Sequence, residues 1–242
     1  MPDIKNHIIY VPTTKNEINF NFIENFISKL ESERLDVYQE YLSAEGLNIY
    51  DITEDEKRAI NQYHRLKWRE FKVETLFERI KTKKLPYKAK ELQIKSIGEN
   101  TLPCLTSSFK NQGLNYFVPK DGVTILKNVI SIPSNSDVYR AYFQSNEFTV
   151  LSDAYAIRWI FDDVELLPNE YLFAVQSINK VTDLPIYSYK NKLGGWNVVK
   201  NKYIQLPVKD DKPDYNTMNT LISAIKKLAI KDVVQYLDKK MK

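Results

Sequence analysis

Hydrophobic residues recur with a helical period near both ends of the chain. Between residues 23 and 41, and again between residues 218 and 237, apolar side chains follow one another at spacings of three, four and seven. This period places them on one stripe of an α-helix about 25 residues and about 38 Å long. Because such a stripe needs a partner, we expect the two helices to pack as an antiparallel coiled-coil pair. The side chains expected to form this pairing are Ile23, Phe26, Ile27, Leu30, Tyr41, Met218, Leu221, Ile222, Ile225, Tyr236 and Leu237.

The pattern between residues 68 and 207 is different. Short β-rich pieces such as WREFKV, GVTILKNVISIPS and WNVVKNKYIQLPV are separated by turn residues, and two helical stretches interrupt them, FKVETLFERIKT and LPNEYLFAVQSINKV. The mixture indicates a mixed α/β domain of about 140 residues and an α+β fold class for the chain. Strands and helices do not alternate regularly, which argues against a doubly wound nucleotide-binding fold.

The two ends of the chain repeat each other at an offset of 195 residues, without a gap. Pro12 matches Pro207, and the tyrosine and leucine at 41–42 match those at 236–237. Each copy reads as a short strand ended by a proline, a polar loop and a long helix. Two core helices that look alike by chance are the alternative. The repeat divides the chain into a strand and loop (1–17), a first spacer helix with a connector (18–64), a central domain (65–208) and a second spacer helix (209–242).

The connector carries a helix-start signal. Thr53 is followed three residues later by Glu56, and this spacing predicts a capping box that begins a short helix.

Charge is distributed unevenly among these parts. The chain has a net charge of +4, but residues 1–64 carry −6, residues 65–208 carry +7 and residues 209–242 carry +3. A domain with concentrated positive charge can displace counterions from a phosphate backbone, so nucleic acid is a candidate partner of the central domain.

Polar side chains of the central domain gather in three turns, at 106–112, 134–140 and 187–192. Asn, Gln, Ser, Thr, Arg and Lys can match base-edge donors and acceptors or phosphate oxygens, and tyrosine can stack. Any one of these turns could be an ordinary solvated loop, but three of them share one basic domain. The candidate DNA-binding residues are Thr106, Ser107, Ser108, Lys110, Asn111, Gln112, Ser134, Asn135, Ser136, Arg140, Tyr187, Tyr189, Lys190, Asn191 and Lys192, and Ser188 lies among them.

Over nearly its whole length the sequence resembles the specificity subunits of Type I restriction-modification systems and of related two-subunit Type II enzymes. The stretches that carry the likeness are EINFNFIENFISKLESERLDVYQEYLSAEGL, ITEDEK, WREFKVETLFERI, LPCLTSSFKNQGLNYFV, ISIPSNSDVYRAYFQ and YIQLPVKDDKPDYNTMNTLISAIKKL. The resemblance implies a target recognition domain that reads a half-site in double-stranded DNA. It also implies helices that act as spacers and dock a methyltransferase subunit, with a restriction subunit as a further partner.

The sequence departs from the family pattern in two ways. Relatives commonly have two recognition domains, whereas one is complete here, and HIIYVPTTKNE reads as the last strand and loop of another. Relatives often have a glycine-containing turn where this chain has Ser134-Asn135-Ser136-Asp137. The chain is therefore interpreted either as a half-length subunit that forms a homodimer or as a fragment of a longer subunit. A two-fold pair would read an interrupted palindrome.

Several chemistries lack the residues they need. Cys104 with His7 and His64 cannot form a zinc cluster, and six glycines supply no phosphate loop, so we expect no metal, cofactor or catalytic residues. Cys104 reads as a small buried hydrophobe, and the Gly194-Gly195 pair as a hairpin turn. No apolar run reaches about 20 residues, and no signal peptide is evident, so we expect a cytoplasmic protein without membrane contact.

Two other function classes remain open. One is a protein-interaction scaffold that keeps the fold without binding DNA, which charge reversal at Lys190 and Lys192 would test. The other is a small metal-dependent nuclease, for which Glu74, Glu78 and Asp153 are candidates by composition alone. Solvated surface carboxylates are the simpler interpretation of those three.

Overall fold

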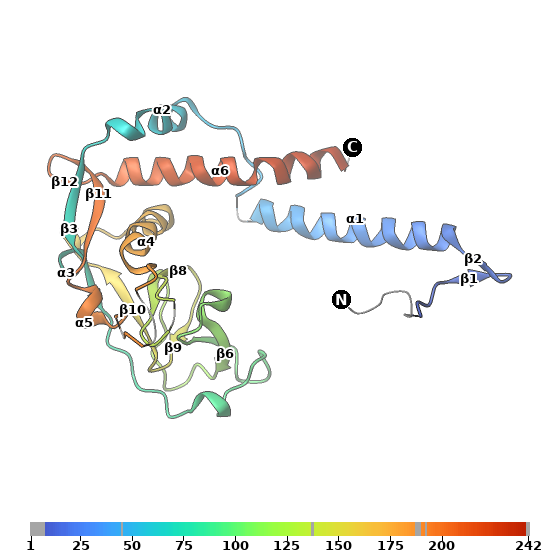
Figure 1. The fold of residues 1–242 in the computed structure, drawn as a ribbon, viewed down its shortest axis with the longest axis horizontal. Helices are drawn as coiled ribbons and strands as arrows, with labels where there is room; N and C mark the ends of the chain where they lie inside the picture. Colours follow the sequence, from blue (N-terminus) through green and yellow to red (C-terminus); the bar gives the residue numbers. More distant parts are fainter. Residues whose placement is uncertain (1–7, 45, 137, 187–189, 192, 241–242) are drawn as a thin grey trace. The chain divides into compact units, whose positions relative to one another are not determined.

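The chain forms two compact units with an α+β fold. A computed structural model describes residues 8–44, 46–136, 138–186, 190–191 and 193–240 (Figure 1). One unit is Thr53–Ala224, and the other combines Met1–Ile52 with Ile225–Lys242. The sequence predicts a central domain of residues 65–208. The globular unit of the structure is longer at both ends, because it also includes residues 53–64 and 209–224.

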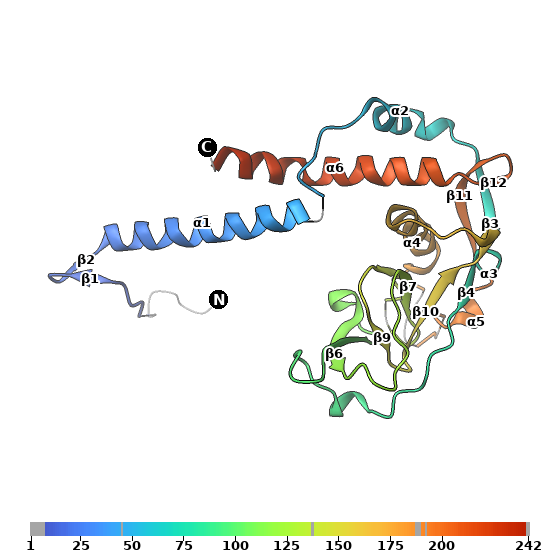
Figure 2. The ribbon, with the colours of Figure 1, turned by 180° about the vertical axis from the view of Figure 1, so that it is seen from behind.

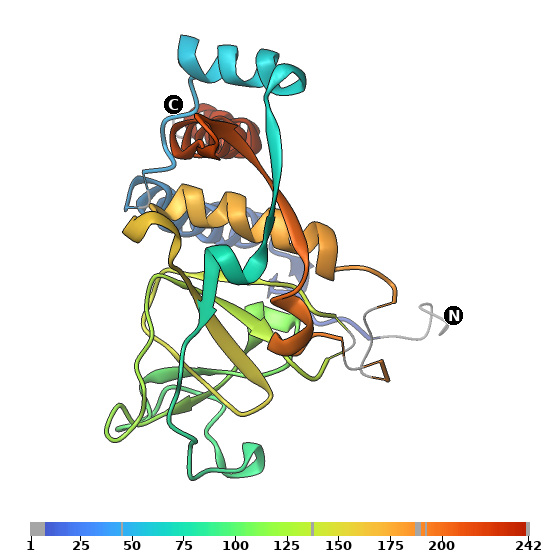
Figure 3. The same cartoon turned by 90° about the vertical axis from the view of Figure 1, so that its left-hand side faces the viewer.

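The globular unit Thr53–Ala224 contains three small sheets. The largest has the order β4-β10-β7-β8 and is antiparallel, with strands β4 (Phe77–Arg79), β10 (Ala154–Trp159), β7 (Val129–Pro133) and β8 (Tyr142–Gln144). The second has the order β12-β11-β3, with β3 (Trp68–Lys72), β11 (Tyr203–Lys209) and β12 (Lys212–Pro213), and Figure 3 shows β3 and β11 side by side. In the third, β5 (Leu102–Leu105) pairs with β6 (Leu114–Val118) and, in parallel, with β9 (Thr149–Val150).

Helices cover these sheets. They are α2 (Glu54–Gln62), α3 (Val73–Leu76), α4 (Pro168–Thr182), α5 (Trp196–Val199) and the first turns of α6 (Tyr215–Lys240), with 3-10 turns η2 (Tyr63–Arg65), η3 (Ala89–Glu91), η4 (Lys110–Gly113) and η5 (Phe161–Asp163). Helix α4 packs against β7, β8 and β11 (Figure 2). Every residue of β7 is buried, which explains why all of its residues except Ser131 are apolar. The main core joins β7 and β10 to α4 and to Met218 of α6.

Helix α2 explains why the globular unit extends back to Thr53. The predicted capping box is confirmed: Thr53 N–H donates to Glu56 Oε2 at 2.8 Å, and Glu56 N–H donates to Thr53 Oγ1 at 3.2 Å. Glu56 is buried, and its Oε1 accepts a hydrogen bond from Ser223 Oγ at 2.6 Å. A buried carboxylate needs such partners, so this contact joins α2 to α6.

Both copies of the internal repeat begin with the same hairpin. Strands β1 (Thr13–Thr14) and β2 (Glu17–Ile18) pair in the same register as β11 and β12. Adding 195 to each residue number of the first pairing gives the second. The turn residues Lys15 and Asn16 have φ of 53° and 66°, and Asp210 and Asp211 have φ of 50° and 61°. Left-handed backbone at both central positions is typical of a type I′ turn, whose twist matches that of the paired strands.

The same helix start follows each hairpin. Asn19 Oδ1 accepts from Phe22 N–H at 2.9 Å, and Asp214 Oδ1 accepts from Thr217 N–H at 3.0 Å. Asn and Asp are favoured at this capping position because their oxygens satisfy free amides of the first turn. The repeat detected in the sequence therefore extends to backbone conformation and capping.

The strands before the hairpins differ. In the second copy Ile204 and Leu206 are both 0% exposed, because β11 pairs with β3 over the main core. Their counterparts Ile9 and Val11 are 82% and 42% exposed. Residues 8–12 form no strand with the described part of the chain, so the segment that reads as the last strand of another recognition domain has no strand partner within the described residues.

The long helices pair over only part of their length. In the second unit, Leu42 near the end of α1 (Phe20–Ala44) is buried with Val234 and Leu237 of α6, with Leu35 and Ile230 partly buried beside them. Lys240 Nζ lies 3.8 Å from Glu31 Oε2, so the contact runs antiparallel. Of the side chains expected to form the pairing, only Leu237 lies in this cluster.

The expectation of pairing along the whole helices is therefore wrong for the single chain. Met218 and Leu221 are buried within the globular unit instead, because the first turns of α6 close its core. Ile23 and Ile222 are partly buried, whereas the remaining side chains of the expected pairing stay exposed: Phe26, Ile27, Leu30, Tyr41, Ile225 and Tyr236.

Candidate nucleic-acid interface

The first two polar loops are joined by one residue, Asp153, in the turn between β9 and β10. Its carboxylate Oδ2 accepts from Ser107 N–H at 3.1 Å, and its backbone carbonyl accepts from Ser134 N–H at 2.8 Å. Tyr142 of β8 adds a bond from its hydroxyl to the Phe109 carbonyl at 3.1 Å. The turns at 106–112 and 134–140 therefore lie together. From its sequence context Asp153 is only a nuclease candidate, and no local signal indicates this anchoring role.

Gly194, two residues beyond the third loop, packs against Tyr139. Gly194 is buried, and a Cβ built on it would meet the ring of Tyr139 at 1.5 Å, so ring and backbone are in close contact. The Tyr155 hydroxyl donates to the Gly194 carbonyl at 2.9 Å. Of this loop's candidate residues, Lys190 and Asn191 are exposed. Four others lie outside the described residues: Tyr187, Ser188, Tyr189 and Lys192.

Two of the predicted contact residues have structural roles. Thr106 and Ser136 are 7% and 8% exposed. Thr106 Oγ1 accepts from Asn115 Nδ2 at 2.8 Å and from Ser108 N–H at 3.2 Å, and Ser136 Oγ accepts from Val138 N–H at 3.2 Å. Their hydroxyls thus hold the loops internally in this chain, and their contacts with DNA stay a prediction.

Arg140 is also engaged within the protein. Its Nε and Nη2 donate to Asp183 Oδ2 at 2.9 and 2.7 Å, and this hydrogen-bonded carboxylate raises the pKa of the guanidinium. The paired charge joins the start of β8 to the end of α4. The guanidinium is exposed, so its DNA contact stays a prediction.

Asn111 and Gln112 stand out among the exposed loop residues. Their backbones are left-handed, with φ of 47° and 54°, and Gly113 follows with φ of 92°. Such backbone is uncommon for non-glycine residues and tends to occur at functional sites. The turn leaves both side chains and Lys110 exposed, with Ser107 and Ser108 partly buried behind them. Terminal amides can pair bidentately with adenine in a major groove.

In the second loop Asn135 is exposed and Ser134 is partly buried. Among the described residues of the three loops, the exposed polar side chains are Lys110, Asn111, Gln112, Asn135, Arg140, Lys190 and Asn191, of which Arg140 is paired with Asp183.

The Gly194-Gly195 pair does not form the hairpin turn that was expected. Gly195 is the N-cap of α5, and its carbonyl accepts from Val199 N–H at 3.1 Å. The buried position of Gly194 against Tyr139 requires a residue without a side chain. The pair therefore serves packing and a helix start.

The carboxylates proposed for a nuclease have other partners. Glu74 pairs with Lys72 at 2.5 Å, Glu78 pairs with Arg158, and Asp153 holds the two loops. Within the described ranges no cluster of three metal-ligating side chains occurs. Burial raises the pKa of the Cys104 thiol to about 12, with a further contribution from the negative Asp153, so the thiol is protonated at neutral pH.

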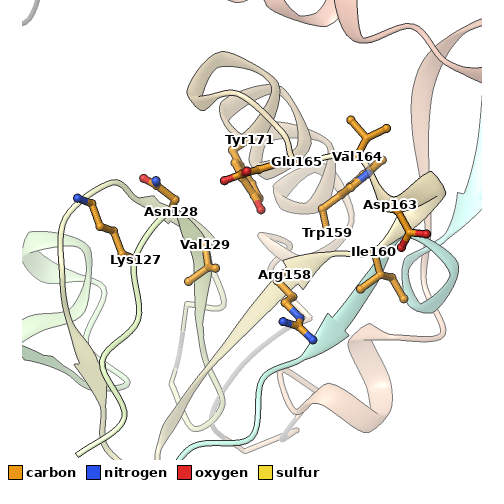
Figure 4. A pocket seen from close by; sticks show the side chains of 10 residues that line it. All are labelled: Lys127, Asn128, Val129, Arg158, Trp159, Ile160, Asp163, Val164, Glu165 and Tyr171. Carbon is orange, nitrogen blue, oxygen red and sulfur yellow. The ribbon is translucent and has the colours of Figure 1, made fainter.

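A separate hollow of about 550 Å³ lies near the start of β7 and the end of β10, and Figure 4 shows the side chains that line it. Lys127 and Arg158 contribute positive charge, but Asp163 and Glu165 line the same hollow and balance it. Arg158 is also paired with Glu78. This balance does not favour a polyanion, so the hollow is not part of the candidate interface.

Comparisons with known proteins give structural likenesses alone. No family model and no curated protein matches the sequence. A Type I restriction-modification system S subunit from M. genitalium is similar over 91% of this chain, with 12% identity and a TM-score of 0.48. An HsdS subunit from Thermoanaerobacter tengcongensis is similar over 95%, with 11% identity and a TM-score of 0.44. The chain spans 55% and 59% of these two structures.

A third similar structure comes from work on complex assembly and conformational transition of the Type I restriction-modification system. It covers 99% of this chain, which spans 65% of it, with 13% identity and a TM-score of 0.45. Among the described helices, none has the length and apolar character that a bilayer crossing requires.

Proposed function

We propose that this chain is the DNA-recognising subunit of a restriction-modification complex and reads double-stranded DNA with the three polar loops. The observation that carries the proposal is the Asn111-Gln112 turn, held by Asp153 beside the second loop with both amides exposed. A rigid element that presents amides can read base edges because its side chains are positioned before binding. Catalysis belongs to partner subunits, and the complex acts in the cytoplasm.

The partners proposed from the sequence resemblance are a methyltransferase subunit, docked on the long helices, and a restriction subunit. The exposed surface of the long helices argues for one more partner, a second copy of this chain. Helix α1 exposes an apolar stripe in which Phe22 and Phe26 stack at 6.3 Å and Leu30 continues the row. An exposed apolar stripe of this length marks an interaction surface. Pairing through the repeated hairpin-helix segments would give a two-fold assembly with two recognition domains.

This pairing yields a prediction for the α1 stripe. The double substitution Phe26→Asp and Leu30→Asp should convert a dimer to a monomer at micromolar concentration, because two buried charges would each cost several kcal/mol. Light scattering of the purified chain measures the mass. Asn25→Asp adds a charge to the same helix outside this row and should leave the mass unchanged. A wild-type chain that remains monomeric up to about 100 μM would contradict the second copy as partner.

DNA recognition is tested by selection from a randomised duplex library. The chain, alone and with its methyltransferase partner, should enrich a defined half-site. Binding without enrichment in either case would count against base reading. Absence of DNA binding combined with partner binding would favour the interaction scaffold.

A further inference from the structure

The positive charge of the central domain is concentrated in one segment, residues 79–95, here called the basic strap. It contains one acidic residue, Glu91, and seven basic ones: Arg79, Lys81, Lys83, Lys84, Lys88, Lys90 and Lys95. The net charge of the strap is thus +6, against +7 for all of residues 65–208. The rest of the domain, including the three polar loops, is nearly neutral.

The strap is attached to the globular unit along its length. Ile80 N–H donates to the Ala156 carbonyl at 2.9 Å, and Lys83 N–H donates to Thr124 Oγ1 at 2.9 Å. Leu85 is buried in a small core with Leu102 and Val118. Further along, Phe117 N–H donates to the Gln93 carbonyl at 2.8 Å. Backbone and apolar side chains therefore fix the strap.

Its cations point outward. Arg79, Lys81 and Lys83 are exposed, whereas Ile80 and Thr82 between them are partly buried, which is the alternation of an extended chain. Within the described part of the chain none of these cations has a carboxylate partner, in contrast to the ion pairs Lys72–Glu74, Lys120–Glu147 and Arg140–Asp183. Unneutralised charge on a fixed backbone is what a polyanion can use.

The strap also borders a small hollow of about 180 Å³, where Arg79, Lys83 and Lys84 face Ser152. Ser152 precedes Asp153, the residue that holds the first two loops. The Arg79 guanidinium also lies 5.3 Å from the centre of the Tyr155 ring, whose hydroxyl donates to the carbonyl of Gly194, two residues beyond the third loop. The strap is thus connected to the first two loops through residues 152–153.

We propose that the basic strap binds the sugar-phosphate backbone of the duplex whose bases the three loops read. This inference rests on the proposed function. The strap supplies affinity and register without base preference, because lysine ammonium groups contact phosphates as point charges. The Arg79–Ser152 hollow accepts one phosphate group, and the outward lysines follow the strand from it.

The test is the salt dependence of duplex binding by the full chain. The triple variant Lys81→Gln, Lys83→Gln and Lys84→Gln should reduce the slope of log K against log salt by about 2.7, since each lost phosphate contact removes about 0.9. The ratio of affinities for a selected and a scrambled duplex should stay unchanged. Lys209→Gln, Lys231→Gln and Lys239→Gln remove three exposed lysines outside the strap and should leave the slope as in the wild type.

The outcomes separate the two proposals. An unchanged slope in the triple variant, while the wild type keeps its sequence preference, would overturn the strap and leave the proposed function intact. A wild type that binds every duplex equally, with a slope that falls in the triple variant, would overturn base reading but support the strap. Loss of sequence preference in the triple variant would overturn the proposal that the strap contacts only the sugar-phosphate backbone. If the triple variant unfolds, Lys90→Gln with Lys95→Gln should reduce the slope by about 1.8.

Discussion

Replacing Asn111 and Gln112 with glycine should abolish most of the sequence preference of the chain while leaving its non-specific DNA binding in place. Both residues have left-handed backbone, which glycine adopts without strain, so the change removes the amides without disturbing the turn. A bidentate amide-adenine pair contributes about 1–3 kcal/mol of discrimination, so each single variant should lose roughly 5- to 150-fold in the specific-to-scrambled affinity ratio. Competition titrations with the selected and scrambled duplexes measure this ratio.

The matched control is Gln205→Gly, which truncates an exposed amide on β11, away from the loops in sequence and outside the candidate site. It should leave the affinity ratio unchanged. If the Asn111 and Gln112 variants discriminate as well as the wild type, these amides do not read bases. Base reading would then have to come from Asn135, Lys190 or Asn191.

Gly194→Ala should destabilise the globular unit by roughly 3 kcal/mol or more, a large share of the stability of an ordinary domain. The added methyl carbon would lie 1.5 and 1.8 Å from two ring atoms of Tyr139, which is fully buried and has no free space to enter. Ring and loop must therefore separate. Urea unfolding followed by tryptophan fluorescence measures the loss, because Trp68, Trp159 and Trp196 all lie in this unit.

The neighbouring glycine supplies the control. A Cβ on Gly195 meets no atom within 4 Å, so Gly195→Ala should change stability by less than about 1 kcal/mol. Equal urea midpoints for the two variants would contradict the close packing of Gly194 against Tyr139. Because Tyr139 lies in the polar turn at 134–140, Gly194→Ala should also weaken specific DNA binding under conditions in which the variant remains folded.

Local signals in the sequence predicted the features that neighbouring residues determine. Thr53 and Glu56 predicted a capping box from their spacing, and the box forms as expected. The gapless repeat predicted two equivalent hairpin-helix segments, and their turns and caps agree in conformation. The alternation of short strands and turns indicated the α+β class correctly.

Properties that depend on distant residues were not predictable in this way. Met218, Leu221 and Leu237 lie on the same apolar stripe, but Met218 is buried in the main core of the globular unit, Leu221 is buried elsewhere in that unit, and Leu237 is buried in the helix pair. Periodicity identifies the stripe without identifying its partner. Thr106, Ser136 and Arg140 likewise have the residue types of DNA contacts, and only their partners Asn115, Val138 and Asp183 reveal their structural roles.

Sequence-dependent binding of duplex DNA is the central claim, and its most direct measurement is the ratio of affinities for the selected and scrambled duplexes at about 0.15 M salt. With its methyltransferase partner present, the wild-type chain should bind the selected duplex at least about 1,000-fold more tightly. Affinities that agree within twofold for all duplexes would contradict the claim.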